Sequence, residues 1–203
     1  MKIKDPKSRI LDVSKKIFYE NGYVKTTTRE IALRAETSES GVFRHYRNKY
    51  EILMAVYDSC WQRVNMEIEQ IVMSSPIDPR EFIIQIIKTL WELYDREPET
   101  IAFIIMNTGN TDTLLLEKKE QAIVTPENEK YLLRIENLCE ECCEKKLLNH
   151  EITTNALREG VLGISEGVLL GWYLYDKTGD LEYAHKKVTI EEAEKLLRII
   201  LFK

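Results

Sequence analysis

Residues 27–49 read TTREIALRAETSESGVFRHYRNK, and this stretch decides the fold of the N-terminal part of the chain. Thr27 followed by Glu30 is a capping-box pattern, in which the threonine oxygen accepts a hydrogen bond from the third helical N–H and the glutamate reaches back. Ile31 and Ala32 then start a narrow apolar stripe that can rest on a neighbouring helix. The pattern predicts a short helix that begins directly after Thr27.

A second short helix follows in the same stretch. Residues 36–37 interrupt the first helix, and Ser38 is a suitable N-cap for a helix that runs to about His45. Val42 and Tyr46 can face inward there. Two short helices joined by a tight turn, with cationic and aromatic residues on the second, have the form that places a helix in the major groove of DNA.

An ordinary helical hairpin with a solvated basic face is the alternative interpretation, and the preceding sequence argues against it. Residues 8–21 carry Ile10, Val13 and Ile17 at helical spacing and end in an Asn-Gly stop signal. This helix can pack against the other two and complete a small core, which a helical hairpin alone would lack. We therefore expect a three-helix domain over residues 1–48.

Three motifs carry a resemblance to a known family. The segments 21–23 (NGY), 26–32 (TTTREIA) and 41–53 (GVFRHYRNKYEIL) occur in this order and spacing within the first quarter of the chain. Together they resemble the DNA-binding domain of the TetR family of bacterial transcriptional regulators. The resemblance implies that the start of the second helix and the third helix contact phosphates and bases.

The helix faces and the resemblance together assign a set of residues to DNA contact. This set is Thr27, Thr28, Arg29, Ser38, Ser40, Gly41, Phe43, Arg44, His45 and Lys49. Gly41 is expected to let the backbone approach DNA closely, and Lys49 to bind a phosphate. Two residues depart from the family pattern: Phe43 stands where tyrosine is usual, and Glu36 stands where glycine is common in the turn.

Charge is divided unevenly along the chain. Residues 1–50 contain 12 Lys/Arg against 6 Asp/Glu, a net charge of +6, and the remaining 17 basic and 28 acidic residues give −11. The overall net charge of −5 therefore conceals a basic N-terminal part on an acidic remainder. A basic surface attracts the phosphate backbone of DNA, whereas an acidic one is repelled by it.

The rest of the chain reads as helix, which makes the predicted fold class all-α. Helices are expected over residues 50–74, 79–96, from Pro98 onward, 126–148, 153–176 and 189–202, while 108–125 has no clear pattern. We expect the N-terminal helix-turn-helix domain to be followed by a larger helical bundle over residues 49–203. That bundle would bind an effector and carry a dimerisation seam of two helices.

The penultimate predicted helix contains an unusual glycine series. Its members are Gly160, Gly163, Gly167 and Gly171, and their spacing places them on one helix face. Each costs about 1 kcal/mol of helix stability relative to alanine, which close approach of another helix could offset. With Leu196, Leu197, Ile200 and Leu201 of the last helix, the series predicts a homodimer interface. Tight packing within one protomer is the alternative.

Large apolar and aromatic residues of the middle helices predict an effector pocket. The candidates are Trp91, Tyr94, Phe103, Met106, Asn107, Glu166 and Trp172. An apolar cavity with a few polar anchors would accept a small apolar or amphipathic effector. The competing interpretation is that these side chains only form the core.

The sequence holds little that predicts catalysis, a cofactor or a metal. Cys139, Cys142 and Cys143 could share a helix face as a redox pair or soft-metal site, but no second ligand pair completes a tetrahedral set. A phosphate-binding loop, a nucleophile elbow and an HExxH motif are all missing from the sequence. We expect neither catalytic residues nor a cofactor.

The combined prediction is a ligand-responsive transcriptional regulator. It would be a cytoplasmic repressor without membrane contact, because the N-terminus does not read as a signal peptide and the apolar runs are short. It would bind a palindromic double-stranded DNA operator as a dimer and be released by a small effector. The alternatives are a DNA-binding structural or division-linked factor without a ligand, a thiol- or metal-sensing regulator, and a helical enzyme.

Overall fold

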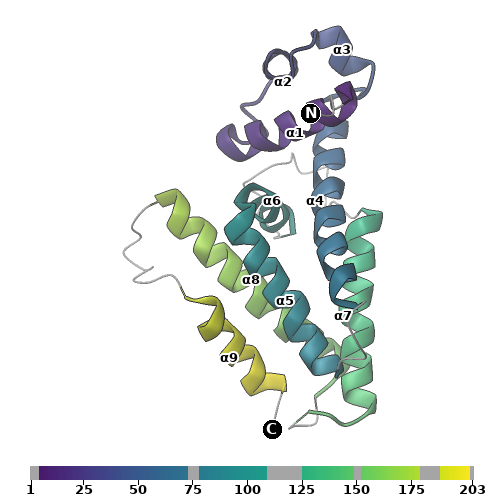
Figure 1. Ribbon diagram of the computed structural model, residues 1–203, viewed down its shortest axis with the longest axis vertical. Coiled ribbons are helices and arrows are strands. Elements are labelled where there is room, and N and C mark those ends of the chain that lie inside the picture. Colours follow the sequence, from purple (N-terminus) through teal and green to yellow (C-terminus); the bar gives the residue numbers. More distant parts are fainter. Residues whose placement is uncertain (1–4, 73–77, 109–124, 149–151, 179–187, 202–203) are drawn as a thin grey trace.

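The computed structural model describes residues 5–72, 78–108, 125–148, 152–178 and 188–201. All regular secondary structure in these ranges is α-helix. Figure 1 shows the three N-terminal helices at one end of the molecule and the C-terminus at the other. We call the three N-terminal helices the head and the remaining helices the body. The all-α class predicted from the sequence is confirmed.

The head consists of α1 (Pro6–Asn21), α2 (Thr28–Arg34) and α3 (Glu39–Phe43). The first helix begins two residues earlier than the sequence pattern predicted, because Asp5 Oδ1 accepts hydrogen bonds from the backbone N–H groups of Lys7 and Ser8 at 3.0 and 3.2 Å. A carboxylate N-cap in front of a proline at the first helical position is a favourable start for a helix.

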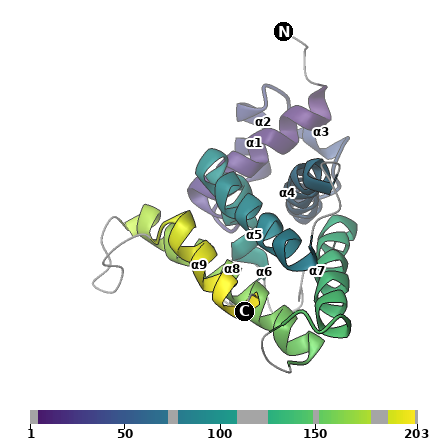
Figure 2. The ribbon, with the colours of Figure 1, turned by 60° about the horizontal axis from the view of Figure 1, so that its bottom comes forward.

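The body contains α4 (Lys49–Val72), α5 (Pro79–Arg96), α6 (Pro98–Thr108), α7 (Pro126–Glu144), α8 (Thr154–Thr178) and α9 (Ile190–Leu201). The long α4 leaves the head and packs beside α7, while α6 lies beneath α1. In both views α9 runs along the face of the body made by α5 and α8, away from the head (Figure 2).

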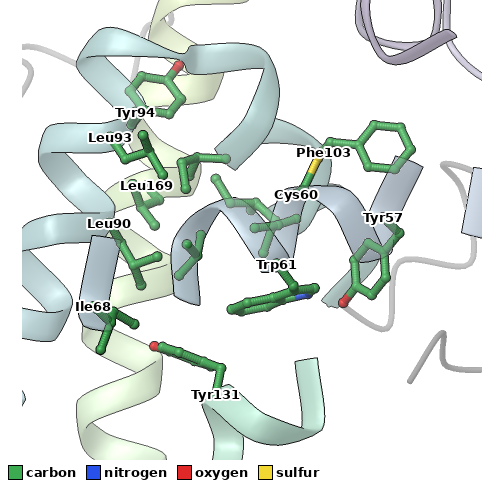
Figure 3. Packing of buried hydrophobic residues seen from close by; sticks show 14 of the residues in the cluster. Tyr57, Cys60, Trp61, Ile68, Leu90, Leu93, Tyr94, Phe103, Tyr131 and Leu169 are labelled. Carbon is green, nitrogen blue, oxygen red and sulfur yellow. The ribbon is translucent and has the colours of Figure 1, made fainter. Parts of the chain in front are cut away.

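The head and the body share a continuous apolar core. Ile10 and Phe18 of α1 and Val42 of α3 are buried together with the first turns of α4. Deeper in the body, the rings of Trp61 and Tyr131 lie 4.7 Å apart between centroids, and both are buried (Figure 3). Aromatic pairs at this spacing contribute more than their buried area alone. The core therefore fixes α4 against both parts of the chain.

Two helices end earlier than their sequence pattern suggested. The recognition helix was expected to reach about His45, but α3 ends at Phe43, and His45 N–H bonds to the Val42 carbonyl in a tighter turn. Likewise α7 ends at Glu144 rather than near residue 148, because Lys146 takes a left-handed conformation with a φ of 52°. Such a residue directs the chain away from the helix axis.

Candidate nucleic-acid interface

Side-chain caps hold the two helices of the helix-turn-helix in place. Thr27 Oγ1 accepts from the Glu30 N–H at 3.1 Å, and Ser38 Oγ accepts from the Gly41 N–H at 3.0 Å. The Thr28 hydroxyl also donates to the Glu39 carboxylate, which joins the first residue of α2 to the first residue of α3. The N-termini of both helices therefore converge, and helix N-termini favour phosphate.

The turn between α2 and α3 is built around Glu36. This residue has a φ of 52°, in the left-handed region that favours glycine. Its N–H bonds to the Leu33 carbonyl at 3.2 Å, and the Thr37 N–H bonds to the Ala32 carbonyl at 3.0 Å. These two bonds form a Schellman motif, so the turn has the glycine-type geometry without a glycine. The Glu36 carboxylate also forms an ion pair with the Arg9 guanidinium group, with Oε2 and Nη1 3.5 Å apart.

Most residues predicted to contact DNA lie on the surface of the head. Thr27, Arg29, Ser38, Ser40, Phe43 and Arg44 are exposed, and Thr28 and His45 are half-buried. Among the described residues, no ion pair or hydrogen bond engages the side chains of Arg29 and Arg44, so both guanidinium groups can meet an anion. The exposed side chain of the neighbouring Arg47 is equally free within the described ranges.

The structure corrects the role expected of Gly41. Its backbone is buried rather than presented to a ligand, and a Cβ placed there would lie 2.3 Å from Thr37 Oγ1. The glycine is therefore required by the packing of the turn against α3. Any larger residue would push the Thr37 side chain aside.

Lys49 also has a different environment from the one expected of a phosphate ligand. Its ammonium group donates to the carbonyl oxygens of Tyr23 and Thr26, both at 2.8 Å, and lies 4.3 Å from the centre of the Tyr23 ring. Burial lowers the pKa of Lys49. The side chain is thus bound to the head itself.

The residues predicted to form an effector pocket do not gather at one place. Trp91, Tyr94 and Trp172 form a buried cluster, with ring centres 6.4 Å apart for the two tryptophans and 5.9 Å for Tyr94 and Trp172. Phe103 instead stacks on Phe18 of α1, 6.1 Å away, at the junction with the head. Figure 3 shows Tyr94 and Phe103 on different sides of the core.

The polar members of that set are less informative. Glu166 is exposed on α8, and desolvation together with the charge of Glu159 raises its pKa. Met106 and Asn107 belong to α6, but their side chains lie outside the described residues. A surface hollow of about 420 Å³ adjoins Trp172, and its other lining residues are Asp95 and residues 188–191.

The glycine series on α8 faces outward. Gly160, Gly163, Gly167 and Gly171 are all exposed, and a Cβ at any of them would meet no described residue within 4 Å. The alternative that these glycines pack tightly within one protomer is therefore wrong. Two exposed leucines, Leu170 and Leu174, continue the same helix face. We call this face, from Gly160 to Leu174, the α8 seam.

The predicted contribution of α9 needs correction. Leu197 and Leu201 are fully buried in their own protomer, where α9 packs on α5, so they cannot face a partner. Leu196 and Ile199 are the exposed apolar residues of this helix, at 50% and 72% exposure. The Ile200 side chain lies outside the described residues.

The cysteines are placed for packing rather than for sensing. Burial raises the pKa of Cys60 and Cys139 to about 12 and that of Cys142 to about 11, which suppresses the reactive thiolate. Cys143 is only half-buried. Within the described residues, no group of three or more potential ligands is arranged to hold a metal ion.

Sequence reasoning missed several residues that these surfaces contain. Arg47 was not assigned, although it lies in the cationic segment just before Lys49. Leu170 and Leu174 were also missed, although they follow Gly163 and Gly167 at the same spacing of seven residues. Extending the glycine periodicity to apolar residues would have found both leucines.

The two short helices α2 and α3 and the tight turn between them give the head the form of a helix-turn-helix, and its exposed surface is basic. The family model described as bacterial regulatory proteins, tetR family, matches residues 10–56, which cover α2, α3 and parts of α1 and α4. Residues 10–56 are therefore similar to the N-terminal part of the tetR family of regulatory proteins, as the resemblance implied. This is a family of transcriptional regulators rather than of enzymes.

Individual relatives share either the head sequence or the whole fold. The uncharacterized HTH-type transcriptional regulator YvkB of Bacillus subtilis (strain 168) is 42% identical over 48 residues. This segment spans 24% of the present chain but only 25% of YvkB. The match to QacR of Staphylococcus aureus, 36% identical, similarly spans 31% of that protein. Sequence similarity to these curated relatives is thus confined to under a third of their length.

Solved structures extend the likeness to the body. The regulator FadR of Bacillus subtilis, solved in complex with stearoyl-CoA, superposes with a TM-score of 0.75 and 14% identity over 96% of this chain and 97% of FadR. AibR, solved with isovaleryl coenzyme A and operator DNA, gives a TM-score of 0.71 and 16% identity over 97% and 98%. The fold is therefore shared across almost the full chain. No described helix is long and apolar enough to cross a bilayer.

Proposed function

We propose that this protein is a dimeric repressor that binds a palindromic operator through its head and leaves it when an effector occupies the body. It would act in the cytoplasm, where its DNA target is accessible. The observation that carries the proposal is the exposed cationic surface around α3, where the guanidinium groups of Arg29, Arg44 and Arg47 lack intramolecular partners within the described residues. Free guanidinium groups can bind phosphates or the O6 and N7 atoms of guanine.

The α8 seam supports the dimer. Four glycines and two leucines form a smooth, partly apolar helix face that is exposed among the described residues, and the neighbouring α9 also exposes Leu196 and Ile199. A symmetric pair of such faces would form a bundle of four helices from two chains. Two heads related by a two-fold axis would then meet two half-sites about one DNA turn apart, which implies a palindromic operator.

The body offers unsatisfied polar groups that an effector could engage. Trp91 Nε1 and Ser165 Oγ are buried and, within the described part of the chain, have no hydrogen-bond partner. Leaving such a group unpaired costs about 1–3 kcal/mol, so a ligand that pairs with it gains that energy. We place the effector next to the Trp91, Tyr94 and Trp172 cluster. Acyl thioesters of coenzyme A are the first candidates, because FadR and AibR were solved with them.

The experiment starts by selecting a duplex from a random pool with the purified protein and measuring its affinity by fluorescence anisotropy at about 50 and 200 mM salt. A regulator should bind the selected duplex far more tightly than random DNA, with a strong loss of affinity as salt rises. Weak binding without sequence preference would contradict operator recognition.

The effector is tested on the same complex. Isovaleryl-CoA, stearoyl-CoA and the free acids are added in turn, with coenzyme A alone as the control. Release by an acyl-CoA at a concentration where coenzyme A has no effect supports the proposed ligand class. A selective operator complex that none of these compounds disturbs would contradict this class. It would favour a DNA-binding structural factor without a ligand.

A further inference from the structure

The ammonium group of Lys49 is held by the segment that connects α1 to α2. It donates to the carbonyl oxygens of Tyr23 and Thr26 at 2.8 Å each and lies 3.4 Å from that of Val24, while the Tyr23 ring covers it at 4.3 Å. An ammonium group has only three N–H donors. The carbonyls of residues 23–26 therefore account for the full bonding capacity of Lys49.

The position of Lys49 in the sequence makes this contact unusual. It is the first residue of α4, where the positive end of the helix dipole disfavours a cation. The carbonyl dipoles and the aromatic face of Tyr23 compensate for this, because both direct negative charge at the ammonium group. A phosphate would have to displace these partners before it could bind there.

The segment held by Lys49 sets the position of α2. Its start, Gly22, closes α1 with a hydrogen bond from its N–H to the Phe18 carbonyl at 2.9 Å. Within it, the Thr26 hydroxyl donates to the Gly22 carbonyl at 2.8 Å, and the next residue, Thr27, is the N-cap of α2. Fixing residues 23–26 on α4 therefore fixes where α2 begins.

We propose that Lys49 is a positioning residue that fastens the α1–α2 segment to the start of α4 and so orients the DNA-reading helices, rather than a ligand of DNA phosphate. The inference rests on the proposed DNA binding for its functional consequence. Phosphate contact in this region belongs instead to the unpartnered, exposed Arg47, two residues earlier.

The two roles predict different binding behaviour, which Lys49→Met and Arg47→Ala can separate. If a side chain contacts a DNA phosphate, its removal weakens binding to all duplexes equally. The magnitude of the slope of log K against log salt then falls by about 0.9. A positioning residue lowers the preference for the selected duplex over random DNA. We expect Lys49→Met to reduce that preference about tenfold or more, and Arg47→Ala to leave the preference unchanged while reducing the slope.

Hydrogen exchange supplies the accompanying structural readout. The Thr26 N–H donates to the Tyr23 carbonyl at 3.3 Å inside the held segment, so its exchange should accelerate in Lys49→Met while exchange in α9 is unchanged. The proposal is overturned if Lys49→Met keeps both its sequence preference and the hydrogen-exchange protection of the Thr26 N–H. In that case its DNA affinity would lose salt dependence as that of Arg47→Ala does.

Chemical modification of the unaltered protein covers the case in which Lys49→Met does not fold. With acetic anhydride and mass spectrometry, Lys49 should react more slowly than the exposed Lys25 already in the free protein, and adding DNA should not slow it further. Rapid reaction of Lys49 in the free protein, suppressed by DNA, overturns the inference. If the protein binds no DNA at all, the proposed function fails, yet the free-protein rates still decide whether Lys49 is held as described.

Discussion

At the scale of single residues, two of the described positions hold a non-glycine residue in the left-handed conformation. Glu36 and Lys146 both have a φ of 52°, and both follow the last turn of a helix in a Schellman motif. An L-amino acid in this conformation is disfavoured by about 1–2 kcal/mol. Glycine removes that strain but adds conformational entropy to the unfolded chain, which offsets part of the gain.

We therefore predict that Glu36→Gly and Lys146→Gly each raise the free energy of unfolding by about 0.5–1 kcal/mol. The lost contact between Glu36 and Arg9 matters little, because the Glu36 side chain is 81% exposed. The measurement is urea denaturation followed by circular dichroism. Lys145→Gly is the control: its φ is −79°, so no strain is relieved, and the added chain entropy and the loss of its exposed ion pair with Glu141 should both lower stability. Equal losses in all three variants would contradict the strain argument.

At the scale of helices, α8 shows how an exposed face differs from a buried one. In an isolated protomer, a methyl group at Gly167 would meet no described residue within 4 Å, so alanine there should add about 1 kcal/mol of helix stability. In the proposed dimer the same methyl group would separate two closely packed helices. The sign of the effect therefore depends on whether a second copy covers the α8 seam.

We predict that Gly167→Ala weakens the dimer and that Gly167→Leu abolishes it, as measured by sedimentation velocity over a range of protein concentrations. Circular dichroism should show that both variants keep their helix content. Glu140→Leu is the control, because it adds a leucine to an exposed position of α7, away from the α8 seam, and should leave the dimer intact. A Gly167→Leu protein that sediments as the unaltered dimer does would contradict the role of the seam.

At the scale of the whole molecule, local and distant interactions differed in how well the sequence predicted them. The caps at Thr27 and Ser38 were predictable, because a cap and the N–H it satisfies are separated by only three residues. The partners of Lys49 were not, because they lie 23 to 26 residues away on an irregular segment. Nor was the burial of Leu197, since α9 is apolar on more than one face and periodicity does not say which face its own protomer covers.

The head and body are joined by a contact that also could not be foreseen from local sequence. Lys15 Nζ of α1 donates to Thr100 Oγ1 of α6 at 2.9 Å, and the rings of Phe18 and Phe103 stack beside this pair. Thr100 is fully buried. This contact is one route by which DNA at the head could affect the body, beside the Phe18–Phe103 stack and α4.

We predict that Thr100→Val weakens the communication between DNA and the body. All three tryptophans lie in the body, at residues 61, 91 and 172, so their fluorescence follows body unfolding alone. A selected duplex at 100 times its Kd should stabilise the protein by about 2.7 kcal/mol and raise the tryptophan-monitored Tm. Removing the hydroxyl that accepts from Lys15 should reduce this rise. Thr89→Val is the control, because the Thr89 hydroxyl donates within α5, to the Gln85 carbonyl at 2.8 Å, and has no bond to the head among the described residues. If the duplex raises the Tm of both variants equally, the Lys15–Thr100 contact does not carry the coupling.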